Sequence, residues 1–326
     1  MSFATQLALA AFAGGVLGSL LLFPVANAIC RRFGLLDQPG HRKIHAEPIL
    51  LSGGLAVFLS MGAVLLCAFA FLQSPWAPQD IQERLLYGYG ARGTQLGALA
   101  FGGVTMLGLG FVDDRLALTA RTKFLVQTGV ALVVALSGVR VTFFVDLTWA
   151  HIVGTVLWLL YVTTIININD NMNGLCGGLS AIASLFFAER AIEQGQYLVA
   201  AFAALAAGAM LGFLPFNYPK AQAFLGDSGS HLLGFVVGTL SILTTYYAPD
   251  TNHTVWSLAT PLLILAVPTV DFLQVSLTRI RRGQPIWIGD TNHLSHRLDR
   301  AGLSRPQAVL VLWLGAVASG FLARLL

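Results

Sequence analysis

Charged side chains are scarce in this sequence. Only 10% of its 326 residues are Asp, Glu, Lys or Arg, whereas 56% are hydrophobic and the mean hydropathy is +0.73. Soluble domains carry charge on about a quarter of their residues. The composition therefore excludes an ordinary soluble protein, and we interpret residues 1–326 as a single integral membrane domain.

Cysteine is scarce as well, and motifs for nucleic-acid binding are missing. Cys30, Cys67 and Cys176 form no CxxC pair and lie in or near apolar segments. This spacing excludes a disulfide framework and a cysteine metal site, so we expect three small buried residues. The net charge of +4 then reflects membrane topology and an anionic partner, and we expect no nucleic-acid partner.

Long apolar runs occupy most of the chain instead. Ten stretches, most of them close to the roughly 20 residues that a helix needs to cross a bilayer, alternate with short polar loops. We expect an all-α polytopic membrane protein with about ten transmembrane helices. The predicted spans are residues 6–29, 50–71, 96–112, 122–137, 149–166, 175–188, 197–213, 230–246, 255–273 and 307–325.

The basic residues predict the orientation of these spans. Fourteen of the 19 Lys and Arg residues lie in loops one, three, five, seven and nine, which share one side of the membrane. By the positive-inside rule these loops are cytoplasmic and both termini lie outside. Nearly all polar motifs fall in the same five loops, so we expect a cytoplasmic cleft where chemistry takes place.

Loops one and three carry the first two motifs. Arg42, Lys43 and His45 precede a glycine pair at a helix entrance, which suits a phosphate-bearing ligand, although the two basic residues could serve topology alone. Asp113 and Asp114 are adjacent carboxylates at a span end. They favour Mg²⁺, or one acid as a base; the alternative is a solvated helix end paired with Arg115.

Loops five and seven add amides and another acid. Asn167, Asp170 and Asn173 lie in an Asn-rich turn between two apolar helices, which indicates hydrogen bonding to a polar ligand or simple helix capping. Asn217 precedes Gly-Asp227-Ser-Gly-Ser at a helix start. That pattern suits Mg²⁺ beside a phosphate, with a plain N-cap as the alternative for Asp227.

Loop nine contributes imidazoles and a guanidinium group. His293, His296 and Arg297 are suited to phosphoryl oxygens, and zinc is disfavoured because the Glu of an HExxH motif is missing. Asp271 lies inside the ninth apolar run, where an unpaired charge is costly, so we expect a buried partner or a functional role.

Taken in order, these motifs resemble those of the polyprenyl-phosphate N-acetylhexosamine-1-phosphate transferases. The family's Asp-x-Pro-x-x-Arg-Lys-x-His stretch is similar to residues 37–45, and its paired aspartates match Asp113 and Asp114. Its Asn-x-x-Asp-Gly-x-Asp-Gly-Leu motif is similar to residues 167–175, its Asn ten residues before an acid matches Asn217 and Asp227, and its His-x-His-His-Arg-Leu resembles residues 293–298.

The resemblance implies a ten-helix enzyme of the inner membrane that uses Mg²⁺, or alternatively Mn²⁺. It would transfer a sugar 1-phosphate from a UDP-N-acetylhexosamine to undecaprenyl or another polyprenyl phosphate within the lipid bilayer. By the same resemblance, a homodimer is an open alternative to a monomer. The resemblance implies that Asp227 binds the metal and that Asp113 and Asp114 position the acceptor or the metal, with Asp114 as an alternative base. It implies nucleotide or substrate binding by Asn167, Asp170, Asn173 and Asn217. It implies diphosphate binding by His293, His296 and Arg297.

Three positions depart from the family pattern. Asn171 replaces a glycine, Asn173 replaces an acid, and Ser295 replaces the middle histidine of the last motif. The last departure favours transfer of N-acetylglucosamine 1-phosphate over phospho-MurNAc-pentapeptide, whose transferases have consecutive histidines there. A cation-coupled transporter is the rival from another class, for which Asp271 alone is suggestive.

Overall fold

The computed structural model describes residues 1–38, 47–142, 147–246, 255–285 and 290–326, and these residues are mostly helical. The helices are α1 Phe3–Arg32, α2 Gly53–Leu72, α3 Gln79–Ala91, α4 Gly93–Leu116, α5 Ala120–Leu136, α6 Thr148–Asn167, α7 Leu175–Glu193, α8 Tyr197–Asn217, α9 Gly226–Leu243, η1 Val255–Ala259, α10 Thr260–Ile264, α11 Ala266–Arg281, α12 Leu294–Arg300 and α13 Arg305–Ala323.

Each of the ten predicted spans contains helix, and the protein is a multi-pass membrane protein. Within the described residues, seven helices are long and apolar enough to cross a bilayer, or eight if the bent segment Trp256–Ile264 plus Ala266–Arg281 counts as one span. Helix α5 has only 17 residues, and α9 begins with the polar sequence Gly-Asp-Ser-Gly-Ser. The number ten therefore stays a prediction.

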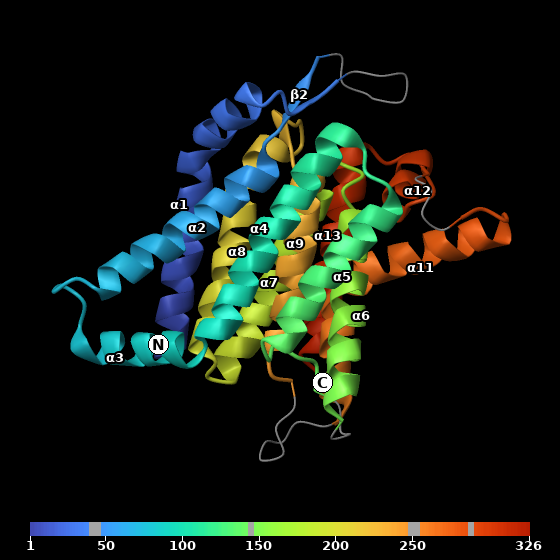
Figure 1. Cartoon of the computed structure of the whole chain (residues 1–326). Coiled ribbons are helices and arrows are strands. Elements are labelled where there is room, and N and C mark those ends of the chain that lie inside the picture. Colours follow the sequence, from blue (N-terminus) through green and yellow to red (C-terminus); the bar gives the residue numbers. More distant parts are fainter. Residues whose placement is uncertain (39–46, 143–146, 247–254, 286–289) are drawn as a thin grey trace.

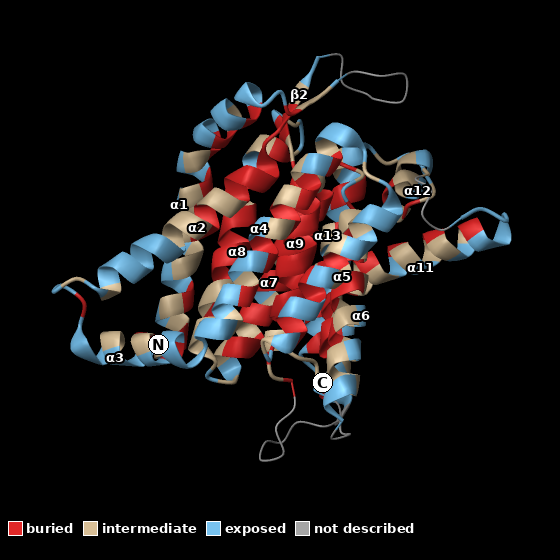
Figure 2. Cartoon of the chain, in the orientation of Figure 1, coloured by how far each residue is buried: buried red, intermediate tan, exposed pale blue. Residues whose placement is uncertain are grey.

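Helix α9 forms the centre of the bundle. It packs against α4, α6, α2 and α7, and nearly all its residues from Gly226 to Ser241 are buried. Figure 2 shows the buried residues concentrated around α7, α8 and α9, while α1, α2 and α5 expose their outer faces. Those outer faces are apolar, for example Leu21 and Leu125, as expected for helices that contact lipid.

The ninth predicted span is not one continuous helix. The chain turns by 75° between Trp256–Ile264 and Ala266–Arg281, so α11 leaves the bundle at a steep angle (Figure 1). Pro268 lies in the first turn of α11, where its missing N–H costs little. The break lets α11 carry Asp271 toward the segment that precedes α12.

Two further elements were not predicted from the sequence. Helix α3 is polar and lies across one end of the bundle (Figure 1). At the other end, β1 Leu36–Asp37, β2 Ile49–Leu51 and β3 Ala223–Phe224 form a small sheet in the order β1-β2-β3. Strand β2 pairs antiparallel with β1, with Leu50 opposite Leu36, and parallel with β3, with Leu50 opposite Ala223. Two- and three-residue strands leave no periodic pattern to detect.

The two ends of the bundle differ in content. The carboxyl ends of α4 and α6, the amino end of α9, the small sheet and α12 gather at one end, whereas both chain termini lie at the other (Figure 1). This arrangement agrees with the prediction of motifs on one face and termini on the opposite face. That the motif-bearing face is cytoplasmic stays a prediction. Cys30 and Cys176 are buried as expected, but Cys67 is exposed on α2.

A glycine allows α4 to approach the start of α9. A Cβ atom on Gly110 would lie 2.2 Å from the Cα of Ser228, whereas one on Gly108 would meet nothing within 4 Å. We predict that Gly110→Ala separates α4 from α9 and lowers the free energy of unfolding by about 1–3 kcal/mol. Thermal unfolding in detergent, with Gly108→Ala as the matched control, measures the difference.

An equal melting temperature for the two variants would contradict the close approach of α4 and α9. Gly108→Ala is expected to leave the melting temperature unchanged or slightly raised, because alanine restricts the unfolded chain more than glycine does.

Candidate active site

The amino end of α9 is capped by a residue of another helix. The two oxygens of Asp114 on α4 accept hydrogen bonds from backbone N–H groups of α9: Oδ1 from Asp227 at 2.8 Å and Oδ2 from Ser228 at 3.2 Å. Gly226 begins α9 with φ of +76°, a conformation that favours glycine. A carboxylate at this position also interacts favourably with the helix dipole. Asp227 is therefore not the N-cap of its own helix.

The side chain of Asp227 instead contacts α6. The Nδ2 of Asn167, the last residue of α6, donates to Asp227 Oδ1 at 3.1 Å and to Ser230 Oγ at 2.7 Å. Asp227 is only partly buried. Three helices, α4, α6 and α9, thus meet at one residue, Asp227, and each contributes a residue that the sequence motifs predicted.

Asp113 has partners that differ from those of Asp114. Lys123 Nζ lies 2.7 Å from Asp113 Oδ2, and the backbone N–H of Leu118 donates to Asp113 Oδ1 at 2.8 Å. Lys123 on α5, rather than Arg115, is thus the cation paired with Asp113. This finding argues against the interpretation as a solvated helix end, because Asp113 is buried.

Sequence reasoning missed a histidine beside these acids. The Nε2 of His231 lies 3.8 Å from Asp113 Oδ2, and its Nδ1 lies 3.3 Å from Gln127 Nε2. His231 is four residues after Asp227 on α9, so both side chains share a helix face. That spacing was the available signal, but the buried imidazole lies in a run that reads as apolar helix.

These residues fit a divalent metal. One ligand atom each from Asp113, Asp227 and His231 lie within 4.8 Å of one another. Carboxylate oxygens suit Mg²⁺, and an added imidazole nitrogen also suits Mn²⁺. Asp114 is not part of this group, and its carboxylate caps α9.

The loop after α6 carries the remaining predicted acid and amides. Asp170 keeps contact with solvent, although protein atoms surround most of its carboxyl group. Loss of hydration, followed by the nearby carboxylates of Asp227 and Asp114, raises the pKa of Asp170. Asn173 Nδ2 donates to Pro219 O at 3.4 Å. The loop thus places a third acid near Asp227 and contacts the segment after α8.

Asn217 connects the loops after α6 and α8. Its Oδ1 accepts from the Gly174 N–H at 2.6 Å, and its Nδ2 donates to the carbonyl of Ala223 in β3 at 2.9 Å. Asn217 is buried, and both of these hydrogen-bond partners are backbone groups. A direct substrate contact for Asn217 stays a prediction.

Asp271 has the buried partner that the sequence led us to expect. Its Oδ2 accepts from His293 Nδ1 at 2.6 Å, and its Oδ1 accepts from the backbone N–H of Leu294, the first residue of α12. Asp271 therefore fixes the histidine and caps α12. A carboxylate engaged in this way gives no support to a cation pathway through the membrane.

The segment around α12 is held by further polar contacts. Burial opposes ionisation of Asp290. Hydrogen bonds from Arg279 Nε at 2.9 Å and from the Asn292 N–H outweigh this effect and lower the pKa of Asp290 to about 2. Burial, followed by the charges of His293 and nearby arginines, lowers the pKa of His296. His296 thus favours the neutral imidazole.

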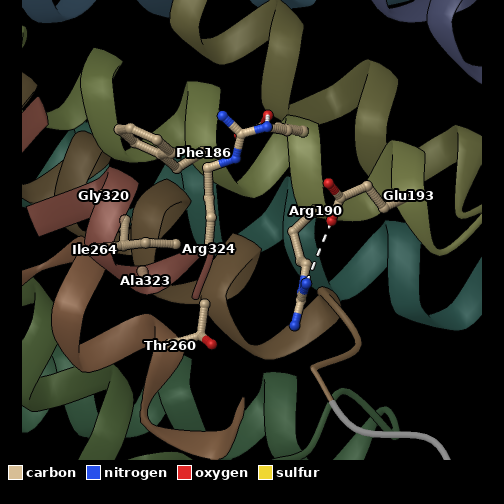
Figure 3. A pocket seen from close by; sticks show the side chains of 9 residues that line it. Phe186, Arg190, Glu193, Thr260, Ile264, Gly320, Ala323 and Arg324 are labelled. Atoms are coloured by element: carbon tan, nitrogen blue, oxygen red, sulfur yellow. Dashed lines mark hydrogen bonds and ion pairs between the residues drawn. The ribbon is translucent and has the colours of Figure 1, made fainter. Parts of the chain in front are cut away.

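Two cavities are lined by residues other than those of the acidic cluster. Arg297 is exposed and lines a groove of about 330 Å³ along α11 with Leu273, Leu277 and Arg281. A smaller cavity of about 20 Å³, shown in Figure 3, lies by the carboxyl end of α7, where Arg190 Nη1 is 3.3 Å from Glu193. Its volume suits about one water molecule, so it is not a substrate site.

The structure brings five of the thirteen predicted site residues together. Asp113, Asp114, Asn167, Asp170 and Asp227 form one cluster, and His293 and His296 lie on a segment that hydrogen bonds connect to the loop after α6 through Ser295 and Asn171. Arg42, Lys43 and His45 lie outside the described residues.

Comparison with known proteins gives consistent relatives. A family model described as glycosyl transferase family 4 matches residues 96–245. The chain is 32% identical to a probable undecaprenyl-phosphate N-acetylglucosaminyl 1-phosphate transferase of Bacillus subtilis, covering 93% of this chain and 80% of the relative. It is 32% identical to a decaprenyl-phosphate N-acetylglucosaminephosphotransferase of Mycobacterium tuberculosis, covering 97% and 81%.

A third relative belongs to the other branch. The chain is 33% identical to a phospho-N-acetylmuramoyl-pentapeptide-transferase of Listeria monocytogenes, with 65% of this chain and 69% of the relative covered.

The position of Asp271 yields a stability prediction. Asp271→Asn removes the charge that holds His293 and the Leu294 N–H, and hydrogen bonds to charged groups contribute about 1.5–3 kcal/mol. Asp299→Asn is the matched control, because Asp299 is half-buried and 3.6 Å from Arg305, an ion pair worth at most about 1 kcal/mol. We expect Asp271→Asn to lower the melting temperature in detergent much more than Asp299→Asn; equal losses would refute the anchoring role.

Proposed function

Because this chain belongs to glycosyl transferase family 4, we propose that it transfers N-acetylglucosamine 1-phosphate from UDP-GlcNAc to undecaprenyl or another polyprenyl phosphate. An acceptor phosphate oxygen would form a bond to the β-phosphorus of the donor. The bond from that phosphorus to the oxygen shared with the α-phosphate would break, and UMP would leave with the electron pair. The products would be polyprenyl diphosphate N-acetylglucosamine and UMP.

The convergence on Asp227 carries this proposal. Asp114 caps α9 and Asn167 bonds to Asp227, so the backbone and the side chain of this acid are both oriented from neighbouring helices. Oriented charge at the reacting phosphates is the main source of catalysis in phosphoryl transfer. The contacts thus fix an acid at the end of the bundle where the motifs gather.

The metal proposed here is Mg²⁺, with Mn²⁺ as the alternative. Asp227 would hold it with Asp113 and His231 beside it, and the bound ion would supply positive charge to the donor diphosphate. Lys123 would remain the partner of Asp113. Asp114 would act by holding α9, since both its oxygens accept backbone hydrogen bonds.

The remaining roles concern the two substrates. His293, His296 and Arg297 would bind the diphosphate, and Asn167, Asp170 and Asn173 would face the nucleotide or sugar, with Asn217 holding their loop. Arg42, Lys43 and His45 are proposed to bind phosphate from loop one. A general base is not required, because the second pKa of a phosphate monoester is near 6 and the acceptor is mostly dianionic at neutral pH.

The proposed location is the inner membrane, with the cluster facing the cytoplasm. The excess of Lys and Arg in the loops at that end of the bundle supports this orientation, and UDP-sugars are cytoplasmic donors in the proposed reaction. The product would be the first lipid-linked intermediate of a cell-wall or surface polysaccharide. A homodimer would be compatible with the proposal.

The alternative donor is UDP-MurNAc-pentapeptide. The relative of that type covers 65% of this chain, against 93% and 97% for the two N-acetylglucosamine relatives. Coverage along nearly the whole chain therefore favours UDP-GlcNAc.

We predict that the purified protein releases UMP from UDP-GlcNAc only when undecaprenyl phosphate and Mg²⁺ are both present. Asp227→Asn should lower kcat by at least about 100-fold, because it removes a charge aimed at the reacting phosphates. Asp80→Asn is the control, since Asp80 belongs to α3 at the opposite end of the bundle.

The donor comparison decides between the branches. Faster turnover of UDP-MurNAc-pentapeptide than of UDP-GlcNAc would overturn the proposed sugar and leave the reaction type intact. Full activity of Asp227→Asn, or activity in EDTA, would overturn the metal site.

A further inference from the structure

Helix α12 is connected to the loop after α6 by a partly buried hydrogen bond. Ser295 Oγ donates to Asn171 Oδ1 at 2.6 Å, and these residues lie 124 positions apart in the chain. Asn171 Nδ2 in turn donates to the carbonyl of Ile168 at 2.9 Å. Ser295 has an exposed fraction of 1%, whereas Asn171 is partly buried, so the donor side of the bond is enclosed by protein.

The same two residues are departures from the motifs that the chain resembles. Asn171 stands where the motif has glycine, and Ser295 stands where it has histidine. The structure shows that the two departures touch. Histidine and glycine at these two positions would supply one large side chain and no second one, whereas serine and asparagine supply two smaller side chains that bond to each other. Either change alone would therefore leave a gap or a collision.

The bond joins the two parts of the site proposed to hold the donor. Asn171 follows Asp170, whose carboxylate lies near Asp227. Ser295 lies between His293 and His296 on the segment proposed to bind the diphosphate. The bond therefore sets the distance between the nucleotide-sugar side and the diphosphate side of one ligand.

We propose that Asn171 and Ser295 form a compensating pair of positioning residues that fixes α12 against the loop after α6 and so determines how tightly the UDP-sugar donor binds. This inference rests on the proposed function. Neither residue takes part in bond making, and the pair acts through Asp170, His293 and His296.

Helix α12 does not need this bond in order to fold. Asp271 caps it and binds His293, and Leu294 and Leu298 pack against a core cluster that includes Met172 and Val309. Loss of the Ser295 hydroxyl should thus change the placement of α12 more than the stability of the protein.

The test uses donor titrations at saturating acceptor for Ser295→Ala, Asn171→Gly, Ser295→His and the double variant Asn171→Gly/Ser295→His, with Ser295→Thr and Ser319→Ala for comparison. We expect Ser295→Ala to raise the donor KM about tenfold, as for the loss of one hydrogen bond, with kcat and the acceptor KM little changed. Ser295→Thr keeps the hydroxyl and should restore the donor KM. Ser319→Ala on α13, whose hydroxyl bonds to Ala316 O, is the control.

The double variant is the decisive measurement. We expect it to bind the donor better than either Asn171→Gly or Ser295→His alone, because glycine makes room for the imidazole. Additive effects of the two substitutions, or a donor KM unchanged in Ser295→Ala, would overturn the pair.

A separate readout distinguishes this inference from the proposed function. Turnover of no UDP-sugar by the wild type would contradict the proposed function, and amide hydrogen exchange then tests the pair directly. Faster exchange at residues 168–174 in Ser295→Ala than in Ser319→Ala supports the connection to α12, and identical exchange overturns it.

Discussion

The site depends on the capping of α9 by Asp114, a residue of a different helix. Adjacent residues on a helix do not face each other, so Asp113 turns to Lys123 while Asp114 reaches the first N–H groups of α9. This division relieves the repulsion between the two acids. It also frees the side chain of Asp227 from capping its own helix, so that Asn167 can hold it beside Asp113 and His231.

The clustering of several candidate site residues could be predicted because polar groups are rare in this chain. With few charges available, each acid or amide at the end of an apolar run stands out, and Asp113, Asp114, Asn167 and Asp227 do converge. The buried partner expected for Asp271 was found for the same reason, since an isolated charge in an apolar helix is costly.

Features that depend on tertiary contacts could not be predicted. His231 reads as part of an apolar helix until α4 and α5 bring Asp113 and Gln127 against it. The small sheet has strands of two or three residues from distant loops. The 75° turn before α11 lies within a segment whose two halves together pass as one apolar span. The contact between Asn171 and Ser295 spans 124 residues, so the two departures look unrelated in the sequence.

The central claim is that Asp114 holds the metal-binding acid in place without binding the metal itself. Titration of the purified protein with Mn²⁺, followed by the loss of the free-ion electron paramagnetic resonance signal, tests it most directly. The account predicts one tight site in the wild type, no tight site in Asp227→Asn, and a site weakened about tenfold in Asp114→Asn, since one charged hydrogen-bond acceptor is lost. Unchanged Mn²⁺ affinity in Asp114→Asn, or in Asp227→Asn, would contradict it.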